Sequence, residues 1–381
     1  MARVKVLEVA EAAGGGVLRH IEQIARQLDP DAFDLTLALS PTRMQDPKHD
    51  IERLRSYGVR VELVPMRRRP APVADLLALS RLTGLMRAGG ADVVHAHSSK
   101  AGFLARWAAR RAGAPRVFYT PHAFAFQCGG VAGRLYERLE RVASGFGGTV
   151  LAVSDGERDL AIHRRIVPPD RVRVVRNAIE PPAVPTTVAR AAARAALGLP
   201  NDVPVVGTVG RLVPQKGVQH LLCAAQILAD PHPRARFVLI GSGPLGRRLL
   251  ALATRLGIGD RVVFAGHRQD AADLCAAMDV YVQPSLWEGL PYAVLDAMGR
   301  ALPVVVSDVP GLTELVAEES GVSPGRVAPP ARPSILADRI GELLVDTSER
   351  RALGQAGRER VLRDHALPQF IASIAGLYRG D

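Results

Sequence analysis

Short apolar runs alternate with longer helical stretches along almost the whole chain of 381 residues. In the first half, buried strands are expected at Val4–Val9, Phe33–Leu39, Val59–Val64, Asp92–His97, Val117–Thr120, Val150–Ser154 and Val172–Val175. In the second half, they are expected at Val205–Val209, Phe237–Ile240, Val262–Ala265, Val280–Gln283 and Val304–Ser307. This alternation predicts an α/β protein with parallel, doubly wound sheets, whose ligands bind beyond the carboxyl ends of the strands.

Proline residues divide the alternation into two halves. Pro181, Pro182 and Pro185 follow the last strand expected in the first half, and an Ala-rich helix is expected over 186–198. A chain of this length can form two domains, each with its own core. We therefore expect an N-terminal Rossmann-like domain over 1–180, a linker or hinge over 181–202, a C-terminal Rossmann-like domain over 203–365 and a helical segment over 366–381.

The positive charge is concentrated in the first half of the chain. Residues 1–180 carry 28 Lys and Arg against 19 Asp and Glu, whereas residues 181–381 carry 21 against 19. A basic surface could attract an anionic acceptor, an anionic membrane or nucleic acid, or it could simply be solvated. The membrane candidates are Arg67–Arg69 and a basic amphipathic helix over Ser99–Arg111.

Composition excludes several classes of protein and favours one compartment. Aromatic residues make up only 4% of the chain, which argues against a stacking surface for nucleic acid. The chain shows no apolar stretch long enough to span a membrane and no signal-peptide pattern, and its three cysteines have no disulfide or zinc spacing. We expect a cytoplasmic protein that can associate with the inner face of the plasma membrane.

The stretch Gln283–Arg300 holds two carboxylates, Glu288 and Asp296, eight positions apart. Gly289 and Pro291 lie between them and mark the start of a helix expected over Tyr292–Met298. Backbone N–H groups at a helix start suit an anion or a sugar oxygen, and carboxylates suit paired sugar hydroxyls. The alternative is that both acids simply favour the positive end of the helix.

A second stretch, Gly210–Gly217, has the sequence GRLVPQKG and opens a helix expected over Val218–Ala229. Arg211 and Lys216 are two cations on a loop with a helix N-terminus behind it. This combination suits a pyrophosphate, because Arg can contact two phosphate oxygens at once and Lys supplies a point charge.

These two stretches resemble the phosphate-binding loop and the two-carboxylate donor signature of the retaining family-4 glycosyltransferases. The resemblance covers most of the chain and implies a GT-B fold, with two Rossmann-like domains facing across a cleft and a last helix crossing back to the first domain. It implies transfer of a hexose from a nucleotide sugar, with UDP the favoured nucleotide and GDP the next, to an acceptor hydroxyl in bacterial polysaccharide or glycolipid assembly. One departure is Asp296, since the family usually has Glu at that position.

The resemblance also implies roles for individual residues. Arg211 and Lys216 would stabilise charge on the leaving diphosphate, and Glu288 would hold sugar hydroxyls together with the backbone of Gly289 and Leu290. The remaining donor contacts would come from Gly15, Gly16, Gly210, Arg268 and Asp296, with Asp296 on the ribose and Arg268 near the base. His122 would face the sugar at the reacting carbon, and His97 and Asn177 would lie on the acceptor side.

No cofactor or metal ion is expected. His95 and His97 point the same way on a strand, but no third ligand is placed beside them. The family's chemistry needs no metal, because cationic side chains stabilise the leaving diphosphate and a phosphate oxygen can accept the acceptor's proton. We expect the partners to be a nucleotide-sugar donor and an acceptor glycolipid, glycan or small molecule, together with an anionic membrane surface but no nucleic acid.

Other functions are also compatible with the sequence. The acceptor could be a soluble secondary metabolite instead of a lipid-linked glycan. An epimerase or phosphorylase could use the same fold, and Asp296 leaves room for a non-catalytic nucleotide-sugar binder. The basic composition also leaves room for a nucleic-acid-binding protein.

Overall fold

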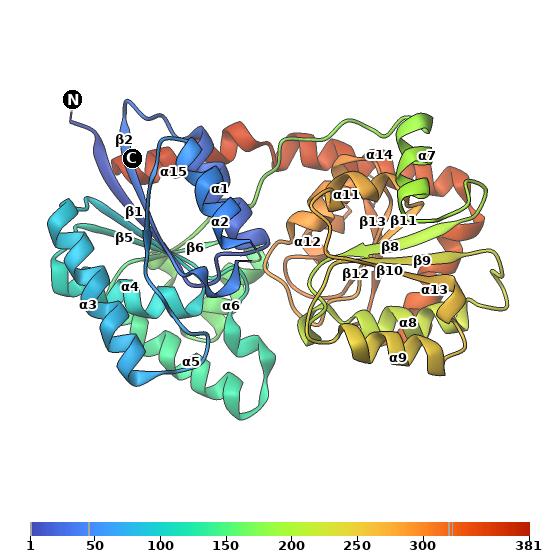
Figure 1. Cartoon of the computed structure of the whole chain (residues 1–381), viewed down its shortest axis with the longest axis horizontal. Coiled ribbons are helices and arrows are strands. Elements are labelled where there is room, and N and C mark those ends of the chain that lie inside the picture. Colours follow the sequence, from blue (N-terminus) through green and yellow to red (C-terminus); the bar gives the residue numbers. More distant parts are fainter. Residues whose placement is uncertain (1, 45, 319–320, 322) are drawn as a thin grey trace. The chain divides into compact units, whose positions relative to one another are not determined.

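The computed structural model describes residues 2–44, 46–318, 321 and 323–381, which form two compact units. The first unit contains the chain up to Asn177 together with Pro368–Asp381, and the second contains Ala178–Leu367. Each unit is built around one parallel sheet covered by helices (Figure 1). This confirms the predicted doubly wound, Rossmann-like fold of both halves.

The sheet of the first unit has its strands in the order β3-β2-β1-β4-β5-β6-β7. The strands are β1 (Val4–Ala10), β2 (Phe33–Leu39), β3 (Arg60–Leu63), β4 (Val93–His97), β5 (Arg116–Thr120), β6 (Thr149–Ala152) and β7 (Val172–Val174). Each of them overlaps an apolar run expected from the sequence. Strands β2 and β3 follow β1 on one side of the sheet, and β4 to β7 follow one another on the other side. The strand order therefore reverses between β1 and β4.

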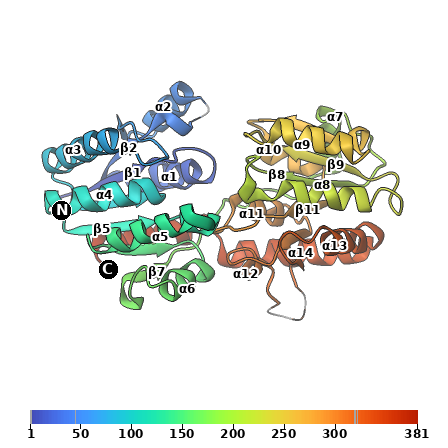
Figure 2. The same cartoon turned by 90° about the horizontal axis from the view of Figure 1, so that it is seen from below.

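Helices cover both faces of this sheet. They are α1 (Gly16–Gln27), α2 (Pro47–Ser56), α3 (Pro72–Gly89), α4 (Ser99–Ala112), α5 (Gly130–Ser144), α6 (Asp155–His163) and α15 (Leu367–Arg379). Because successive strand residues point to opposite faces, Val94 and Ala96 pack with α3 and α4, while His95 and His97 point to the other face. Figure 2 shows α3, α4 and α5 side by side along one face.

The C-terminal helix α15 lies within the first unit, close to β1 in Figure 1. Its side chains Phe370, Ile374 and Tyr378 are buried. The Tyr378 hydroxyl donates a hydrogen bond of 2.7 Å to Glu8 on β1, which joins two segments 370 positions apart in the sequence.

The second unit has six parallel strands in the order β10-β9-β8-β11-β12-β13. The strands are β8 (Val205–Val209), β9 (Arg236–Ile240), β10 (Val262–Gly266), β11 (Val280–Gln283), β12 (Val304–Ser307) and β13 (Gly325–Ala328). Five of them were expected, and β13 is an additional edge strand whose short run, GRVA, lacks a strong apolar pattern. The strand order reverses between β8 and β11.

The helices of the second unit are α7 (Thr187–Ala196), α8 (Val218–Ile227), α9 (Gly246–Arg255), α10 (Ala271–Leu274), α11 (Tyr292–Gly299), α12 (Thr313–Val316), α13 (Pro333–Val345) and α14 (Thr347–Asp364). Helices α8 and α13 pack together on one face, and α11 packs on α14. The strands share one apolar core with α8, α9 and α13 and with Leu353 of α14. Parallel strands buried on both faces explain the continuous Val- and Leu-rich runs of the sequence.

Helix α7 lies in the segment where the sequence suggested a linker, and the structure folds it into the second unit. Arg194 on α7 is 2% exposed and donates to Asp279 Oδ2 at 2.9 Å. Arg190, one turn earlier, pairs with Asp279 Oδ1, and the backbone N–H of Val205 donates to Asp279 Oδ2 at 2.8 Å. A partly buried group of ion pairs holds α7 against the sheet, which a proline pattern alone did not reveal.

Helix α4 packs most of its apolar side chains into the core of the first unit, and membrane contact by Ser99–Arg111 stays a prediction. Leu104 and Ala108 are buried, and Trp107 stacks on Phe146 with ring centroids 5.7 Å apart. Arg106 is also buried, where it donates to Glu140 at 2.8 Å. The basic amphipathic pattern of α4 therefore serves a core contact and a buried ion pair.

None of the helices in the described part of the chain combines the length and the hydropathy that crossing a lipid bilayer requires.

Replacing Asp279 by Ala should destabilise the second unit by about 3–5 kcal/mol, because it leaves the buried Arg194 without a counter-charge. The chain has two tryptophans, Trp107 in the first unit and Trp287 in the second. In a Trp107→Phe background, the urea midpoint of Trp287 fluorescence therefore measures the second unit. Asp270→Ala removes a solvent-exposed ion pair in the same unit and should leave the midpoint nearly unchanged. Equal midpoint shifts in both variants would contradict the structural role of Asp279.

Candidate functional site

The two motif stretches of the second unit meet at its strand-order reversal. The loop 210–217 follows β8, and the loop 284–291 follows the neighbouring strand β11. Both loops leave the carboxyl ends of adjacent parallel strands at the point where the order reverses. Ligands of doubly wound sheets bind at such a switch point.

Backbone contacts hold these two loops against each other. The N–H of Leu286 donates to the carbonyl of Gln215 at 2.8 Å. Gly217 has a φ of +60°, and a Cβ at this position would lie 2.0 Å from the carbonyl oxygen of Pro284. Only glycine permits both this conformation and this close approach.

A buried polar cluster joins the loops through Glu288. Lys216 Nζ lies 2.6 Å from Glu288 Oε1, and the same oxygen accepts from Ser285 Oγ at 2.6 Å and from Gln283 Nε2 at 3.0 Å. Glu288 is buried, whereas the Lys216 side chain remains partly exposed. A cation and a carboxylate are thus held side by side, which suits recognition of a phosphate and of sugar hydroxyls by neighbouring groups.

Other residues predicted to bind the sugar donor lie near this cluster, and some of them are buried while others are exposed. Gly289 and Leu290 are buried just before α11, and Asp296 is buried on α11 itself. Arg211 has an exposed side chain on the loop after β8. A Cβ on Gly241, after β9, would lie 2.0 Å from the carbonyl oxygen of Gly210, so the loops after β8 and β9 also pack closely.

Arg268 lies on the loop after β10, the outermost strand on that side of the sheet. Its guanidinium makes two hydrogen bonds to Asp270, at 2.8 and 2.7 Å. In the structure Arg268 is therefore engaged in a surface ion pair, and a contact with a nucleotide base stays a prediction.

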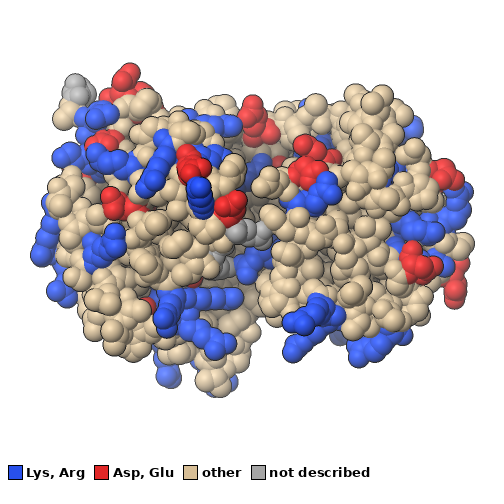
Figure 3. Space-filling view, viewed as in Figure 1, with Lys and Arg blue, Asp and Glu red and all other residues tan. Residues whose placement is uncertain are grey.

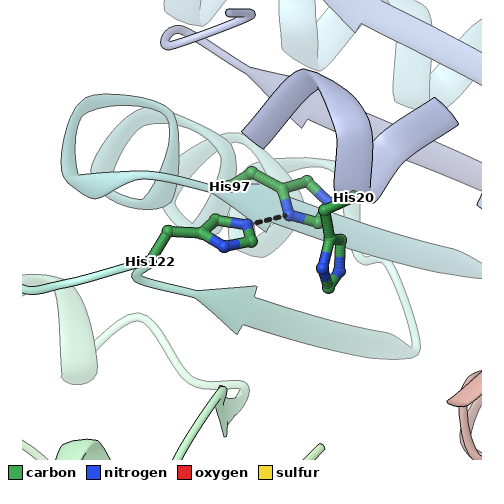
Figure 4. A group of neighbouring side chains, drawn as sticks. All are labelled: His20, His97 and His122. Atoms are coloured by element: carbon green, nitrogen blue, oxygen red, sulfur yellow. Dashed lines mark hydrogen bonds between the residues drawn. The ribbon is translucent and has the colours of Figure 1, made fainter. Parts of the chain in front are cut away.

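The first unit has its own polar cluster, at the reversal between β1 and β4. Its members come from strands β1, β4 and β5, from helices α1 and α15, and from the loops after β5 and β7. They are Glu8, His20, His95, His97, Thr120, His122, Asn177 and Tyr378. Figure 4 shows three of them, with His20 and His122 placed on either side of His97. Most of these side chains are buried, and His122 is partly exposed.

Hydrogen bonds connect this cluster from the core outward. Glu8 Oε2 lies 3.0 Å from His97 Nε2, and His97 Nδ1 lies 3.1 Å from His122 Nε2. His20 Nδ1 lies 3.1 Å from Asn177 Oδ1. The structure thus buries His97 and Asn177, and His97 is hydrogen-bonded to the partly exposed His122.

The backbone at His122 is strained and held in place. His122 and Ala123 have φ values of 54° and 75°, in the left-handed region that costs about 1–2 kcal/mol for a residue with a side chain. The carboxylate of Glu157 accepts from Ala123 N at 2.7 Å and from Val153 N at 2.9 Å. Strain that is stabilised by a buried carboxylate at a strand end is typical of a functional position.

The predicted glycine loop precedes α1. Gly15 has a φ of 57°, and it and Gly16 are exposed at the N-terminus of a twelve-residue helix that has no acidic residue in its first turn. The N–H groups of this helix end are therefore compatible with an anionic group.

Two groups of side chains in the first unit have the composition of a metal site. They are His20, His97 and His122, and Glu8, His95 and His97, and within each group the ligand atoms lie within 4.8 Å of one another. In the structure His97 uses both ring nitrogens for hydrogen bonds to Glu8 and His122. A metal ion bound to either of these nitrogens would have to replace one of these bonds.

Sequence reasoning missed several residues that build the two clusters. Glu8, His20, Glu157 and Tyr378 support the first, and Gln283 and Ser285 support the second. One signal was available for Glu8, because a charged residue in the middle of an apolar strand must find a partner on its own face of the sheet. No local pattern indicated that Tyr378 would be that partner.

Burial makes the histidine cluster sensitive to acid. Burial lowers the pKa of His20 and of His97 to about 3, and it lowers the pKa of His95 and His122 well below the usual value of 6.5. The unfolded chain therefore binds more protons below pH 6.5, so this contribution to stability is complete above 6.5 and decreases as the pH falls. Glu8 has the opposite effect on the pH dependence of stability, because burial raises its pKa above 4.5.

The first unit should therefore lose about 1.4 kcal/mol of stability per buried histidine between about pH 7.5 and about pH 5.5. Urea unfolding followed by Trp107 fluorescence in a Trp287→Phe background measures this unit. A His163→Asn variant, which changes an exposed histidine on α6, should show the same pH dependence. A urea midpoint that does not change over this pH range would show that the cluster already holds protons in the folded state.

Comparison with known proteins identifies the family. Residues 15–178 match the family model described as Glycosyl transferase 4-like domain, and residues 189–360 match the model described as Glycosyl transferases group 1. Together the two matches cover both units.

Two curated relatives and one solved structure agree with this match. A UDP-Gal:alpha-D-GlcNAc-diphosphoundecaprenol alpha-1,3-galactosyltransferase of Escherichia coli is 32% identical, over 69% of this chain and 70% of its own length. A D-inositol 3-phosphate glycosyltransferase of Acidothermus cellulolyticus is also 32% identical, over 96% of this chain and 85% of its own length. The crystal structure of Anabaena HepE in complex with UDP and glucose has the same fold, with a TM-score of 0.85 at 21% identity over 100% of both chains. The chain therefore belongs to the group 1, family-4 glycosyltransferases with the GT-B fold, which use nucleotide-sugar donors.

Proposed function

We propose that this glycosyltransferase moves a hexose from a nucleotide diphosphate sugar, with UDP preferred over GDP, to an acceptor hydroxyl with retention of the anomeric configuration. The observation that carries the proposal is the Lys216–Glu288 pair, which joins the two motif loops at the β8–β11 reversal. A relative at 32% identity is named for a UDP-Gal donor, which supports the choice of nucleotide.

In the proposal, different groups of the second unit bind different parts of the donor. Arg211 and Lys216 bind the diphosphate, Glu288 and the N–H groups of Gly289 and Leu290 hold sugar hydroxyls, and Asp296 binds the ribose. Gly210 lets the phosphate loop approach the diphosphate, and Arg268 exchanges its bond to Asp270 for a contact near the base. Asp296 is shorter by one methylene than the usual Glu, so its ribose contact is longer or passes through a water molecule.

In the proposed reaction, the bond between the sugar C1 and the diphosphate oxygen breaks while the acceptor oxygen bonds to C1 on the same face. The acceptor's proton passes to a phosphate oxygen, and the nucleoside diphosphate leaves with the bonding electron pair. Arg211 and Lys216 stabilise the charge that develops on the diphosphate. The proposal gives Glu288 no role as a covalent nucleophile, because attack on the same face needs no covalent intermediate.

The proposal requires neither a cofactor nor a metal ion, because two cationic side chains take the electrostatic role on the diphosphate. In the first unit, it gives His122 a hydrogen bond to a sugar hydroxyl and gives Gly15 and Gly16 backbone contacts near the donor phosphate. His97 and Asn177 then act on the substrate side indirectly, because both are buried.

For the acceptor, the proposal favours a lipid-linked glycan of polysaccharide assembly. The name of the Escherichia coli relative describes an acceptor carried on diphosphoundecaprenol. The alternative is a small soluble acceptor, which is supported by the name of the Acidothermus cellulolyticus relative. A non-catalytic nucleotide-sugar binder is the alternative of another class, and donor binding without turnover would indicate it.

A basic and apolar surface of the first unit supports a membrane-bound acceptor. We define it by the exposed Val73, Leu76 and Leu77 of α3, the exposed Val131 and Leu135 of α5, and the exposed Arg67–Arg69 just before α3. Figure 3 shows basic side chains spread among uncharged residues over this part of the molecule. Apolar side chains flanked by arginine suit an anionic lipid surface, and we propose peripheral binding at the inner face of the plasma membrane.

Direct measurement of donor use tests the enzymatic proposal. Calorimetry with UDP, GDP, ADP and TDP, with and without EDTA, should show selective binding of UDP that EDTA does not change. With UDP-galactose, release of UDP should depend on an added acceptor, either GlcNAc-diphosphoundecaprenol or inositol 3-phosphate.

Lys216→Ala should lower kcat about a hundredfold and weaken UDP binding less, because the cation acts mainly on developing charge. Lys48→Ala, on the exposed face of α2, is the matched control.

A loss of UDP affinity as large as the loss of kcat would contradict this role of Lys216. Binding of none of the four diphosphates would contradict the assignment of the donor site. Binding that disappears with EDTA would contradict metal independence.

Vesicle flotation tests the membrane surface. The protein should float with phosphatidylcholine vesicles that contain phosphatidylglycerol and stay behind with pure phosphatidylcholine. The pair Leu76→Glu and Leu77→Glu should abolish flotation, because it replaces buried apolar contact with charge repulsion. The pair Val188→Glu and Leu250→Glu, at exposed apolar positions of the second unit, should float like the unchanged protein. Equal flotation of both pairs would refute this surface.

A further inference from the structure

His122 is tied to the core of the first unit through one ring nitrogen. Its Nε2 lies 3.1 Å from His97 Nδ1, and the two rings lie nearly parallel with centroids 5.4 Å apart (Figure 4). A hydrogen bond between two neutral imidazoles needs one donor and one acceptor, so the tautomer of one ring decides the tautomer of the other. The state of His97 therefore determines which nitrogen of His122 carries its proton.

Glu8 determines which ring nitrogen of His97 carries the proton. Glu8 Oε2 lies 3.0 Å from His97 Nε2. Burial raises the pKa of Glu8, while the hydrogen bond from Tyr378 acts in the opposite direction. We assign Glu8 as ionised, and an ionised carboxylate can only accept a hydrogen bond, whereas a protonated Glu8 would donate to His97 and give the opposite tautomer of His122. The other oxygen, Oε1, accepts from the Tyr378 hydroxyl at 2.7 Å. His97 therefore donates through Nε2 to Glu8 and presents a lone pair at Nδ1 to His122.

The remaining bonds of the cluster are consistent with this assignment. Because Tyr378 donates to Glu8, its oxygen can accept from His95 Nδ1, which lies at 2.7 Å. His95 Nε2 can then accept from the Thr120 hydroxyl at 2.8 Å. The chain of bonds from Thr120 to His122 thus has a donor and an acceptor in every pair, with each histidine neutral.

We infer that Glu8, acting through His97, holds His122 as the Nε2–H tautomer, so that His122 Nδ1 is an acceptor for a substrate hydroxyl. This inference rests on the proposed function for the contact between His122 and the substrate, but the tautomer itself does not depend on it. Glu8 and His97 are positioning residues, because both are buried and act on the substrate through His122.

An acceptor of this kind suits a sugar hydroxyl that donates. Sugar hydroxyls donate as well as accept, and an imidazole that presents a lone pair selects a hydroxyl that donates. The strained backbone at His122 is held by Glu157, and the ring is held by His97, so both the place and the direction of the lone pair are determined before the substrate arrives. Other groups around His97 and His122 preserve their neutral state, since His20 is a further buried imidazole that lies 4.7 Å from the His122 ring.

Nitrogen-15 NMR of the full chain with labelled histidine tests the tautomer directly. The ten histidines can be resolved by long-range nitrogen–proton correlation, and His122→Asn assigns the signal of His122. We expect Nε2 of His122 to carry the proton and Nδ1 to be unprotonated from about pH 6 to about pH 8. Glu8→Gln, which can donate as well as accept, should give a mixture of tautomers at His122. Tyr378→Phe keeps the carboxylate that accepts from His97 and should leave the His122 tautomer unchanged.

The rate of turnover provides a second test of the role of His97. His97→Leu removes the acceptor for His122 and should lower kcat for UDP release from UDP-galactose by about ten- to a hundredfold, with a smaller change in KM. His97→Asn restores an acceptor near the position of Nδ1 and should recover most of the loss. A merely structural role of His97 would reduce the folded fraction of both variants without separating their kcat values.

Several outcomes would overturn the inference. They are an Nδ1–H tautomer of His122 in the unchanged protein, an unaltered tautomer in Glu8→Gln, and a stoichiometric metal ion that shifts the His122 signals when it is removed with EDTA. If the tautomer is as expected but no UDP-sugar is turned over by the unchanged protein, the proposed function fails and the positioning of His122 by Glu8 stands.

Discussion

A buried carboxylate lies beside the strand-order reversal of each sheet, and the polar groups of each unit are arranged around it. Glu8 accepts from Tyr378 and His97 in the first unit, and Glu288 accepts from Lys216, Ser285 and Gln283 in the second. Burial makes an unpaired carboxylate costly, so each needs several donors, and these donors must come from separate segments of the chain. The same requirement that stabilises the fold therefore brings the chemically active side chains together.

The two carboxylates serve different purposes. Glu288 is close to the surface, beside a partly exposed lysine, on loops that glycine allows to pack backbone against backbone. Glu8 is fully buried, and two imidazole rings, those of His97 and His122, connect it to a partly exposed side chain. A carboxylate of the first kind can contact a ligand, whereas one of the second kind can only orient a residue that does.

Helix α15 contributes to this arrangement although it is the last element of the chain. It covers the face of the first sheet that carries Glu8, His95 and His97, and it supplies the tyrosine that bonds to Glu8. Together with His20 of α1, this helix packs against the carboxylate and the histidines. The shifts in pKa that burial imposes on these histidines follow from the same coverage.

The sequence alone determined the two parallel sheets, the residues of the phosphate loop and of the acidic loop, and the family, because periodicity and motif spacing are properties of consecutive residues. Only the tertiary structure decided that Leu104 and Ala108 of α4 pack in the core, that α7 belongs to the second unit, that β13 closes the second sheet, and that Glu8, His97 and His122 form one chain of bonds. Those three residues are separated by 89 and by 25 positions, and their contacts arise from the order in which the strands pair. Strand order depends on burial across the whole unit, which no local stretch of sequence specifies.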